Sequence, residues 1–560
     1  MPQKAVFSRA PLLDVPHAFL SNGLIRTDDK KIDRLYQNAN KYLDRPCVWE
    51  GLFNVACLLK KDPLKEPVAL SVQKAIQETD EGAFNGSFTD QIHIARAAFS
   101  LYEYSVDRAI LKRIASWFRY LETVFDRLPE EDDVLFHAAD LMELLVRYYQ
   151  ATGLKSVLKL CSLLRAASFD WTTALHTFQQ AVPVKDNTEV FSADHFAAPD
   201  KISYDQRQKI INHAEWLADG IRYTLFSGIF SGNSRDLSAG NTAWRYLLKK
   251  HYALCGGTTG DPFLLGKASD QAVSTCTILA WTEAFASHML LDNDSWAADE
   301  LVRIIFNGLD YCLETDIIPE RQRVNQLNKQ AGNPVSENAA YLYGRLTRAV
   351  ACVFRHAITV THDGIRINYL IPCRMIHSFQ KQTVILNMTY QELRFECDHP
   401  FRASVDLFIS ARETAEITAL CGGKTFPAAP ERPDNSRTGI FLRSDRTWLP
   451  GDGYHFEQEK KIICEKTSHQ GVCFFIRNRL MCLPVHDRFS PVAVCGQAVC
   501  SDGKVSVKVG SIDRWKEENG IFRDIPVLPE ITGNIFEVQL EPYAAAHSRI
   551  SMFPRGKQHA

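Results

Sequence analysis

The chain has 560 residues, of which 46% are hydrophobic and 23% are charged, a composition typical of globular proteins and not of disordered, collagen-like or coiled-coil chains. Its 64 Lys and Arg residues and 66 Asp and Glu residues give a formal net charge of −2, so the charge indicates no nucleic-acid or membrane partner. Neither a signal peptide nor a membrane-spanning stretch is found. The 15 cysteines, many of them inside apolar runs, are typical of reduced thiols. A cytoplasmic protein is therefore predicted.

The chain from about residue 30 to 355 has the periodicity of helices. One predicted helix presents a single apolar face, formed by Ile110, Ile114, Trp117, Phe118 and Leu121. Short turns between paired helices predict stacked helical hairpins, which form either a solenoid or a closed α/α toroid. The absence of a fixed repeat period favours the toroid.

The periodicity changes to two from about residue 357. Strands are predicted at 358–361, 365–369, 383–386, 404–408, 472–476, 505–509 and 535–538. The segment 426–437 is rich in proline and polar residues and is predicted to be a loop. Many short strands separated by turn residues are typical of a β-sandwich.

The predicted fold is therefore of the α+β multidomain class. A helical toroid is expected at 1–355 and one or more β-sandwich domains at 356–560, with the toroid capped by the sandwich. Residues 1–25 could pack on the sandwich.

Two segments of the helical part could contribute side chains to the centre of a toroid. Trp49, at the start of a predicted helix, could stack on a sugar face, although it could equally be a core tryptophan. Asp90 and His93 follow a tight loop that contains Asn85, Gly86 and Ser87, and they share a helical face. The alternative is that Thr89 or Asp90 caps the helix that follows.

A glycine-rich turn, Cys255-Gly256-Gly257-Thr258-Thr259-Gly260-Asp261-Pro262, lets the backbone approach a bound group closely. It presents Asp261 as a candidate catalytic acid or base, and its alternative is a simple Asp-Pro turn. Two histidines, His213 within a helical segment and His137 before a long helix, are candidate substrate contacts. A lone histidine of this kind is more often a satisfied core residue.

In their shared order these segments resemble glycoside hydrolase family 127, the β-L-arabinofuranosidase family, over most of the chain. The motifs that carry the resemblance are Val48-Trp49-Glu50-Gly51-Leu52, Asn212-His213-Ala214, the turn Gly256 to Phe263, Ser274-Thr275-Cys276, Ile304-Ile305-Phe306-Asn307-Gly308, Arg446-Thr447-Trp448-Leu449-Pro450-Gly451-Asp452 and the strand Val472 to Leu480. The resemblance implies an (α/α)6 barrel followed by β-sandwich domains. It also implies that Asp261 and His213 match the family's acidic residue on the glycine turn and its active-site histidine.

The sequence departs from the family at its catalytic centre. The family uses a zinc-bound Cys nucleophile, with ligands from a Glu-Thr-Cys motif and a Cys-Cys-Pro-x-Asn motif. Here the first motif reads Ser274-Thr275-Cys276, and the second falls at 333–338, where Asn338 matches but no cysteine is present. Because one thiolate cannot hold zinc without partners, we expect no metal, no other cofactor and no thiol-based cleavage.

The resemblance therefore predicts a glycoside hydrolase that acts on short oligosaccharides, arabinofuranoside-like or related, by carboxylate chemistry. Asp261 is the predicted acid, Glu337 the second carboxyl, and Asp90 the reserve. Trp49, His93, His137 and His213 are expected to bind the sugar. Two alternatives are a catalytically inactive sugar-binding homologue and a lyase or hydratase on uronic-acid sugars. The predicted partner is an oligosaccharide, and a homodimer is one option for the assembly.

Overall fold

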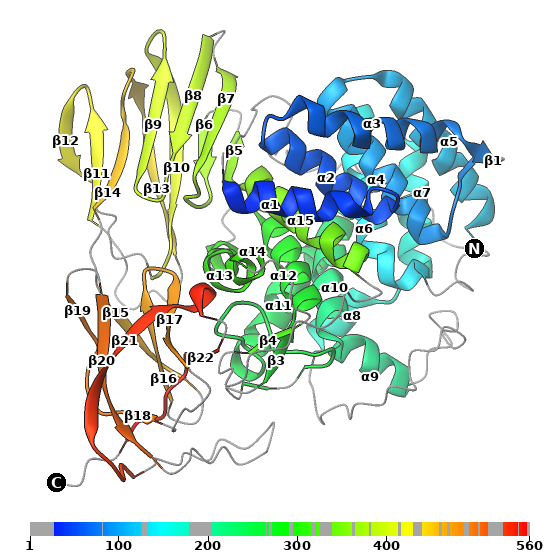
Figure 1. Cartoon of the computed structure of the whole chain (residues 1–560). Helices are drawn as coiled ribbons and strands as arrows, with labels where there is room; N and C mark the ends of the chain where they lie inside the picture. The colour runs from blue at the N-terminus through cyan, green and yellow to red at the C-terminus, as the bar shows by residue number, and fades with distance from the viewer. Residues whose placement is uncertain are drawn as a thin grey trace.

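The structure is a computed structural model (Figure 1) that places helices in the N-terminal part and strands in the C-terminal part. It describes residues 27, 29–80, 82–125, 133–178, 204–264, 266–267, 271–289, 295–314, 321–323, 339–360, 364–379, 382–412, 416–428, 439–457, 462–467, 471–485, 492–501, 504–512, 530–546 and 548–556. Among the described helices, none combines the length and the apolar character needed to cross a membrane. The N-terminal segment 1–25 lies outside the described residues.

The helical part confirms the predicted helices. The first helices are α1 (Lys30–Ala39), α2 (Pro46–Leu58), α3 (Asp62–Gln77), α4 (Phe88–Ser105), α5 (Arg108–Val124), α6 (Asp133–Thr152), α7 (Ser156–Ala167) and α8 (Trp171–His176). They are followed by α9 (Tyr204–Asn212), α10 (Ala214–Ser231), α11 (Ser234–Lys250), α12 (Thr275–His288), α13 (Ser295–Ile304), the π-helical turn η6 (Ile305–Leu309), α14 (Asp310–Glu314) and α15 (Ala339–Ala357). Helix α5 buries the five apolar residues of its predicted face. His137, expected before a long helix, lies instead inside α6.

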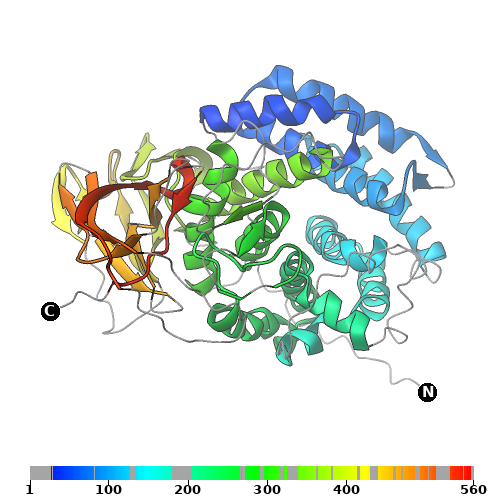
Figure 2. The same cartoon turned by 60° about the horizontal axis from the view of Figure 1, so that its bottom comes forward.

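Six of the described helices contact one another in a closed cycle. Helix α2 packs on α4, α4 on α6, α6 on α10, α10 on α12, α12 on α15, and α15 again on α2. Five outer helices each pack on one helix of this cycle: α3 on α2, α5 on α4, α7 on α6, α11 on α10 and α13 on α12. Figure 2 shows the helices arranged around a common centre, in order from blue through cyan to green.

Neighbouring helices of the cycle run in the same direction. Cys47 of α2 lies beside Gly344 of α15, and Gly51, one turn later, lies beside Thr347. Both glycines are required by close approach, because a Cβ on Gly344 would lie 2.4 Å from the Cys47 carbonyl oxygen.

Two further pairs of neighbouring helices have the same parallel order. Between α2 and α4, Glu50 pairs with Arg96, and Asn54 pairs with Ser100. Between α4 and α6, Arg96 contacts Asp140 and Glu143, and Glu103 pairs with Arg147. Glu215 in the first turn of α10 contacts Tyr341 in the first turn of α15 and raises the pKa of Cys276 in the first turn of α12. The N-terminal turns of the six helices therefore lie at one end of the cycle.

The strands of the described residues form three larger sheets and two short two-stranded sheets. The first sheet has the order β13 (Ile440–Trp448), β10 (Phe401–Ile409), β6 (Gly364–Ile367), β5 (Ile358–Val360). The second has the order β12 (Lys424–Pro427), β11 (Glu416–Cys421), β14 (Gly453–Glu457), β9 (Glu392–Cys397), β8 (Gln382–Met388), β7 (Cys373–Phe379). The third has the order β15 (Ile462–Lys466), β16 (Val472–Ile476), β17 (Arg479–Pro484), β21 (Ile535–Pro542), β20 (Lys504–Ser511), β18 (Val492–Val494), with β19 (Val499–Ser501) and β22 (Arg549–Ile550) beside it. The two-stranded sheets are the hairpin of β1 (Thr79–Asp80) with β2 (Ala83–Phe84) and the pair of β3 (Ala272–Ser274) with β4 (Arg321–Arg323), which lie on either side of α12, α13, η6 and α14 in the chain.

Side chains of the first two sheets pack against each other. The ring of Phe395 in β9 lies 5.4 Å from that of Phe401 in β10 and 4.9 Å from that of Trp448 in β13. The strands begin at Ile358, directly after α15, as the change of periodicity predicts. The prediction of a loop at 426–437 is wrong for its first two residues, because Phe426 and Pro427 belong to β12 and pair with β11. Residues 429–437 lie outside the described residues.

Polar contacts attach the helical part to the sheets. The Asp299 carboxylate of α13 accepts hydrogen bonds from the Ser410 hydroxyl, at 2.8 Å, and from the Ala411 N–H, at 2.9 Å. The Asn307 amide in η6 donates to the Asn478 carbonyl at 2.8 Å and accepts from the Leu480 N–H at 2.7 Å. The Phe-Asn-Gly motif of the sequence thus joins the helices to β17.

Candidate active site

His213 begins α10 at the N-terminal end of the cycle. Its ring accepts a hydrogen bond from the Trp216 N–H and stacks on the Trp216 ring with 4.0 Å between centroids. Burial lowers the pKa of His213 to about 3, although Asp219 opposes this shift. The imidazole is therefore neutral at physiological pH and suited to hydrogen bonding rather than to proton donation.

The glycine turn packs directly on this histidine. The Ala214 N–H donates to the Pro262 carbonyl at 2.9 Å, and the Phe263 ring lies 5.8 Å from the His213 ring. Gly260 allows this approach, since a Cβ there would lie 2.3 Å from that of Ala214. The structure thus brings Asp261 and His213 to the same end of the cycle. The Asp261 carboxylate pairs with Arg321 of β4 at 2.9 Å.

Two further carboxylates lie on the first turns of α10. Glu215 accepts hydrogen bonds from the Tyr341 hydroxyl, at 3.1 Å, and from Arg345 Nη1. The same Nη1 atom lies 3.4 Å from Asp219 Oδ2, and Arg345 Nη2 lies 3.2 Å from Asp219 Oδ1. Because one guanidinium nitrogen bonds to both carboxylates, their nearest oxygen atoms are close together.

The two carboxylates lie at the edge of the buried region. The side chains of Glu215 and Asp219 are 14% and 11% exposed, whereas that of Glu283, deeper in the cycle, is 2% exposed. Burial raises the pKa of Asp219, while Arg345 and Arg222 oppose the rise. A carboxyl with a raised pKa beside a second carboxylate is the usual composition of an acid and base pair.

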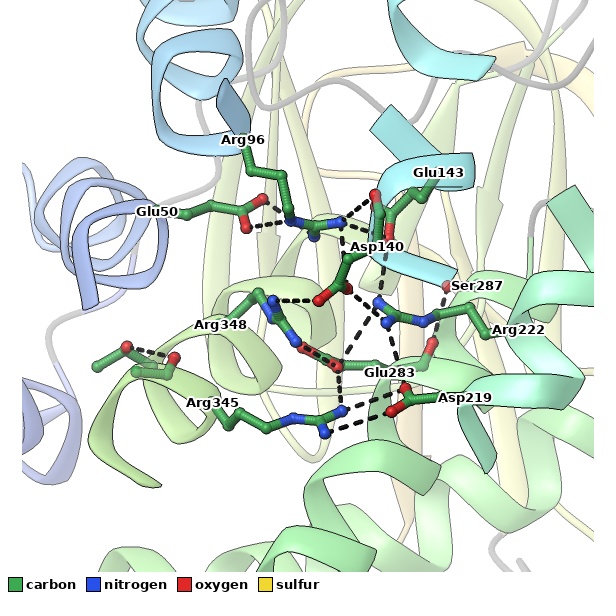
Figure 3. Close-up of polar contacts among 12 residues, drawn as sticks. Glu50, Arg96, Asp140, Glu143, Asp219, Arg222, Glu283, Ser287, Arg345 and Arg348 are labelled. Atoms are coloured by element: carbon green, nitrogen blue, oxygen red, sulfur yellow. Dashed lines mark hydrogen bonds and ion pairs between the residues drawn. The ribbon is translucent and has the colours of Figure 1, made fainter. Parts of the chain in front are cut away.

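The centre of the cycle contains a network of ion pairs between arginines and carboxylates (Figure 3). The Glu283 carboxylate pairs with Arg345 at 2.9 Å and with Arg348 at 2.5 Å. Arg222 Nη2 lies 2.5 Å from Asp140 Oδ1. The network continues through Arg96, which bonds to Glu50, Asp140 and Glu143.

The network fills the space between the helices. The cavity that it leaves beside Glu143, Arg222 and Glu283 has a volume of about 20 Å³, which is room for about one water molecule. The network therefore leaves no room for a sugar among its own side chains, and Glu215, Asp219 and His213 lie on its N-terminal side.

Trp49 lies in the second turn of α2 with 7% of its surface exposed. Its Nε1 donates to the Leu43 carbonyl at 2.7 Å. A buried ring with a satisfied N–H favours the core alternative over stacking on a sugar.

Asp90 and His93 both lie in α4, as predicted. Ser87 is the N-cap, and Asp90 completes a capping box by accepting from the Ser87 N–H at 3.2 Å. The structure thus shows a capping role for Asp90. His93 is 6% exposed. Neither residue has a contact with Asp261 or His213 among the hydrogen bonds, ion pairs and ring contacts seen in the described residues. The side chain of His137 and the whole of Glu337 lie outside the described residues.

Comparison with protein-family models and with curated protein sequences gives no match. Solved structures do match. A protein described as a glycoside hydrolase shares 12% identity at a TM-score of 0.70, covering 98% of this chain and 100% of its own. A family 127 β-L-arabinofuranosidase from Geobacillus stearothermophilus T6 shares 15% identity at a TM-score of 0.67, covering 95% of each chain. A further family 127 β-arabinofuranosidase shares 13% identity at a TM-score of 0.63, covering 94% of this chain and 92% of its own.

The resemblance to glycoside hydrolase family 127 is confirmed at the level of the fold. It extends over nearly the whole chain, through both the helical part and the sheets. At these identities the family 127 structures establish how the chain folds and leave its chemistry to be argued from its own residues.

The zinc site implied by family 127 does not fit the donors around Cys276. Burial raises the pKa of the Cys276 thiol, with Glu215 as the next contributor in the same direction. Glu215 itself is hydrogen-bonded to Arg345 and Tyr341. Within the described residues, no group of three His, Cys, Asp or Glu side chains has the geometry to hold a metal ion. We therefore derive no step through zinc.

The site residues predicted from the sequence do not include Glu215, Asp219, Tyr341 or Arg345. A signal for the first two was present, since Glu215 follows His213 by two residues and Asp219 lies one helical turn further on. Charged residues inside an otherwise apolar helix indicate buried ion pairs. The pairing of α10 with α15 is not visible in the sequence, because Glu215 and Arg345 are 130 positions apart.

Proposed function

We propose that the chain is a carbohydrate-active enzyme, a glycoside hydrolase that acts on short oligosaccharides of arabinofuranoside or a related sugar. The cycle of six parallel helices is then an (α/α)6 barrel capped by β-sandwich domains. The observation that carries the proposal is the carboxyl pair of Glu215 and Asp219 on Arg345, next to His213, at the end of the cycle where the helices begin. The overall likeness to family 127 structures supports it.

Asp219 is the proposed general acid. Its raised pKa favours the protonated form that must donate to the leaving oxygen. Glu215 is the proposed nucleophile or base, because Arg345 and the Tyr341 hydroxyl hold its carboxylate in a fixed position beside Asp219.

The spacing of this pair favours cleavage with retention. The nearest oxygens of the two carboxylates bond to one nitrogen of Arg345, and this closeness suits the short carboxyl separation of a retaining pair. We therefore expect a glycosyl-enzyme intermediate on Glu215, which water then hydrolyses with Asp219 acting as base.

Asp261 and His213 complete the proposed sugar-binding surface. Asp261, paired with Arg321 at 2.9 Å, is the proposed acceptor for sugar hydroxyls or a second base. The neutral His213 ring is expected to hydrogen-bond sugar hydroxyls. Glu337, Asp90, His93, His137 and Trp49 remain untested predictions as site residues.

The acid is tested by comparing two substrates of different leaving-group ability. In Asp219→Asn, hydrolysis of an unactivated arabino-oligosaccharide should fall by about 10²–10⁴-fold. The kcat/KM for the 4-nitrophenyl arabinofuranoside should fall much less, since nitrophenolate leaves without protonation and kcat/KM does not include the later hydrolysis of the glycosyl-enzyme, in which Asp219 is the base. The control Asp445→Asn changes an exposed strand residue of β13 and should match the wild type on both substrates. Equal losses on the two substrates would remove Asp219 as the acid.

One observation favours a second candidate function, that of a sugar-binding homologue without activity. All the carboxylates of the central network have arginine partners. Such pairing holds the charges in fixed positions whether or not the protein is a catalyst. Calorimetry with the same oligosaccharides decides between the two functions. Binding without any product after days of incubation would support the binding protein.

A further inference from the structure

A second cavity, of about 590 Å³, lies away from the helix ends, between the helical part and the three sheets. It is bounded by η6, by the turn between β8 and β9, by the end of β10 and by the turn between β16 and β17. It shares no lining residue with the candidate active site described above. Its volume is in the range of cavities that bind small molecules.

The walls of this cavity are mainly aromatic and aliphatic. Phe306 of η6 and Tyr390 of the β8–β9 turn have ring centroids 5.6 Å apart. Phe408 of β10 and Phe456 of β14 also line it. These walls suit a ligand with an apolar body.

The two charged residues among the described lining residues are both arginines, Arg477 and Arg479. Arg479 lies over the Phe306 ring at 5.5 Å and has Asp310 as a partner at 3.8 Å. Arg477 differs, because its Nη2 atom is buried and has no hydrogen-bond partner among the described residues. A buried guanidinium nitrogen without a partner is costly. Because Arg477 lines the cavity, a turn of its guanidinium would bring this nitrogen to an acceptor on a ligand.

The backbone of Arg477 is also held in an unfavourable conformation. Ile476 pairs with Arg479, so Arg477 and Asn478 form a two-residue turn between β16 and β17. Arg477 has φ of 56°, in the left-handed region that glycine or asparagine usually occupies in such turns. Strain of this kind at a residue with a side chain is often found at binding sites.

The turn is fixed in place by its neighbours. Asn478 accepts from the Ser410 hydroxyl at 2.9 Å through Oδ1 and from the Asn307 amide at 2.8 Å through its carbonyl. Arg477 is therefore presented to the cavity by a rigid support that includes both the helical part and the first sheet.

From these observations we propose that this cavity binds a small organic carboxylate with an apolar body. The apolar part lies against Phe306, Tyr390 and Phe408, and the carboxylate accepts a hydrogen bond from Arg477. An arginine fork matches the two oxygens of a carboxylate. The proposal is independent of the proposed glycosidase activity.

The test compares 4-phenylbutyrate with 4-phenylbutanol, the neutral alcohol that has the same carbon skeleton. Isothermal titration calorimetry on the full chain should show the acid binding at least about tenfold more tightly than the alcohol. In Arg477→Gly this preference should disappear, while the thermal melt stays the same or rises, because glycine suits the positive φ. The control Arg402→Gln removes an arginine of β10 that is 75% exposed and should keep the preference.

Three results would overturn the proposal. They are no binding of 4-phenylbutyrate at millimolar concentration, equal affinity for the acid and the alcohol, and an unchanged preference in Arg477→Gly. If Arg477→Gly fails to fold, the wild-type comparison of acid with alcohol still decides. A preference below twofold in that comparison would reject the carboxylate.

Discussion

Glu300 of α13 is a buried carboxyl whose protonation couples to the stability of the helix–sheet contact. Burial raises its pKa from 4.5 to about 8, with Arg412 opposing and Asp299 and Glu465 adding to the rise. Arg303 approaches it at 4.0 Å. The folded state thus binds this proton more tightly than the unfolded state does.

It follows that Glu300 removes stability as the pH rises from 4.5 to about 8. Glu300→Gln should not show this loss. The free energy of unfolding of the variant should therefore rise relative to that of the wild type, by up to about 1.4 kcal/mol per pH unit in this window. Urea unfolding at several pH values measures it. The exposed control Glu396→Gln should show a flat difference. A flat difference in Glu300→Gln as well would show that burial does not raise this pKa.

Asp90 is the predicted site residue whose observed contacts give it a structural role. Because it completes the capping box of α4, we expect Asp90→Ala to lower the free energy of unfolding by about 1 kcal/mol with kcat unchanged. Ser87→Ala is the matched change on the other side of the box and should give a similar loss. A fall of a hundredfold or more in kcat, measured on folded Asp90→Ala, would restore its role as reserve carboxyl.

At the scale of elements, the close pairing of α2 with α15 closes the cycle of helices. A Cβ on Gly344 would lie 2.4 Å from the Cys47 carbonyl oxygen, and a backbone atom cannot move aside as a flexible side chain can. Gly344→Ala should therefore lower the free energy of unfolding by about 1–3 kcal/mol, as measured by denaturant titration.

The control for this change is Gly496→Ala, where the nearest atom lies 3.9 Å from the added Cβ and the glycine is exposed. It should be close to neutral. Equal stabilities for the two alanine variants would mean that the helices do not pack as closely as the structure shows.

The helices and strands could be predicted because their signal is local. The apolar face of α5 and the change of period after α15 depend on residues within one or two turns of each other. The predicted loop failed at Phe426 and Pro427 because pairing of β12 with β11, a contact between segments, outweighed local composition.

At the scale of the whole molecule, the segments that lie together could be predicted from the sequence, whereas the ion pairs that join them could not. The resemblance matched both His213 and Asp261 of the glycine turn to active-site residues, and the structure brings the histidine and the turn together. It could not predict the ion pairs of the network, since Arg348 and Asp140 are 208 positions apart. Periodicity identifies apolar faces, whereas a buried charge is recognised only once its partner is known.

The six helices of the cycle begin at one end, and the paired charges of the network lie deeper in the cycle. Glu215 lies at that end and is therefore the central residue of the proposed site. The most direct measurement is kcat of Glu215→Gln on the 4-nitrophenyl arabinofuranoside and on an arabino-oligosaccharide, with the thermal melt recorded beside it. We expect at least about a thousandfold loss on both substrates and a nearly unchanged melt, because Arg345 keeps Asp219 and Glu283 as partners. Glu122→Gln, a change at a partly buried side chain of the outer helix α5 that pairs with Lys159, should keep full activity. A well-folded Glu215→Gln with activity near that of the wild type would contradict the proposed site.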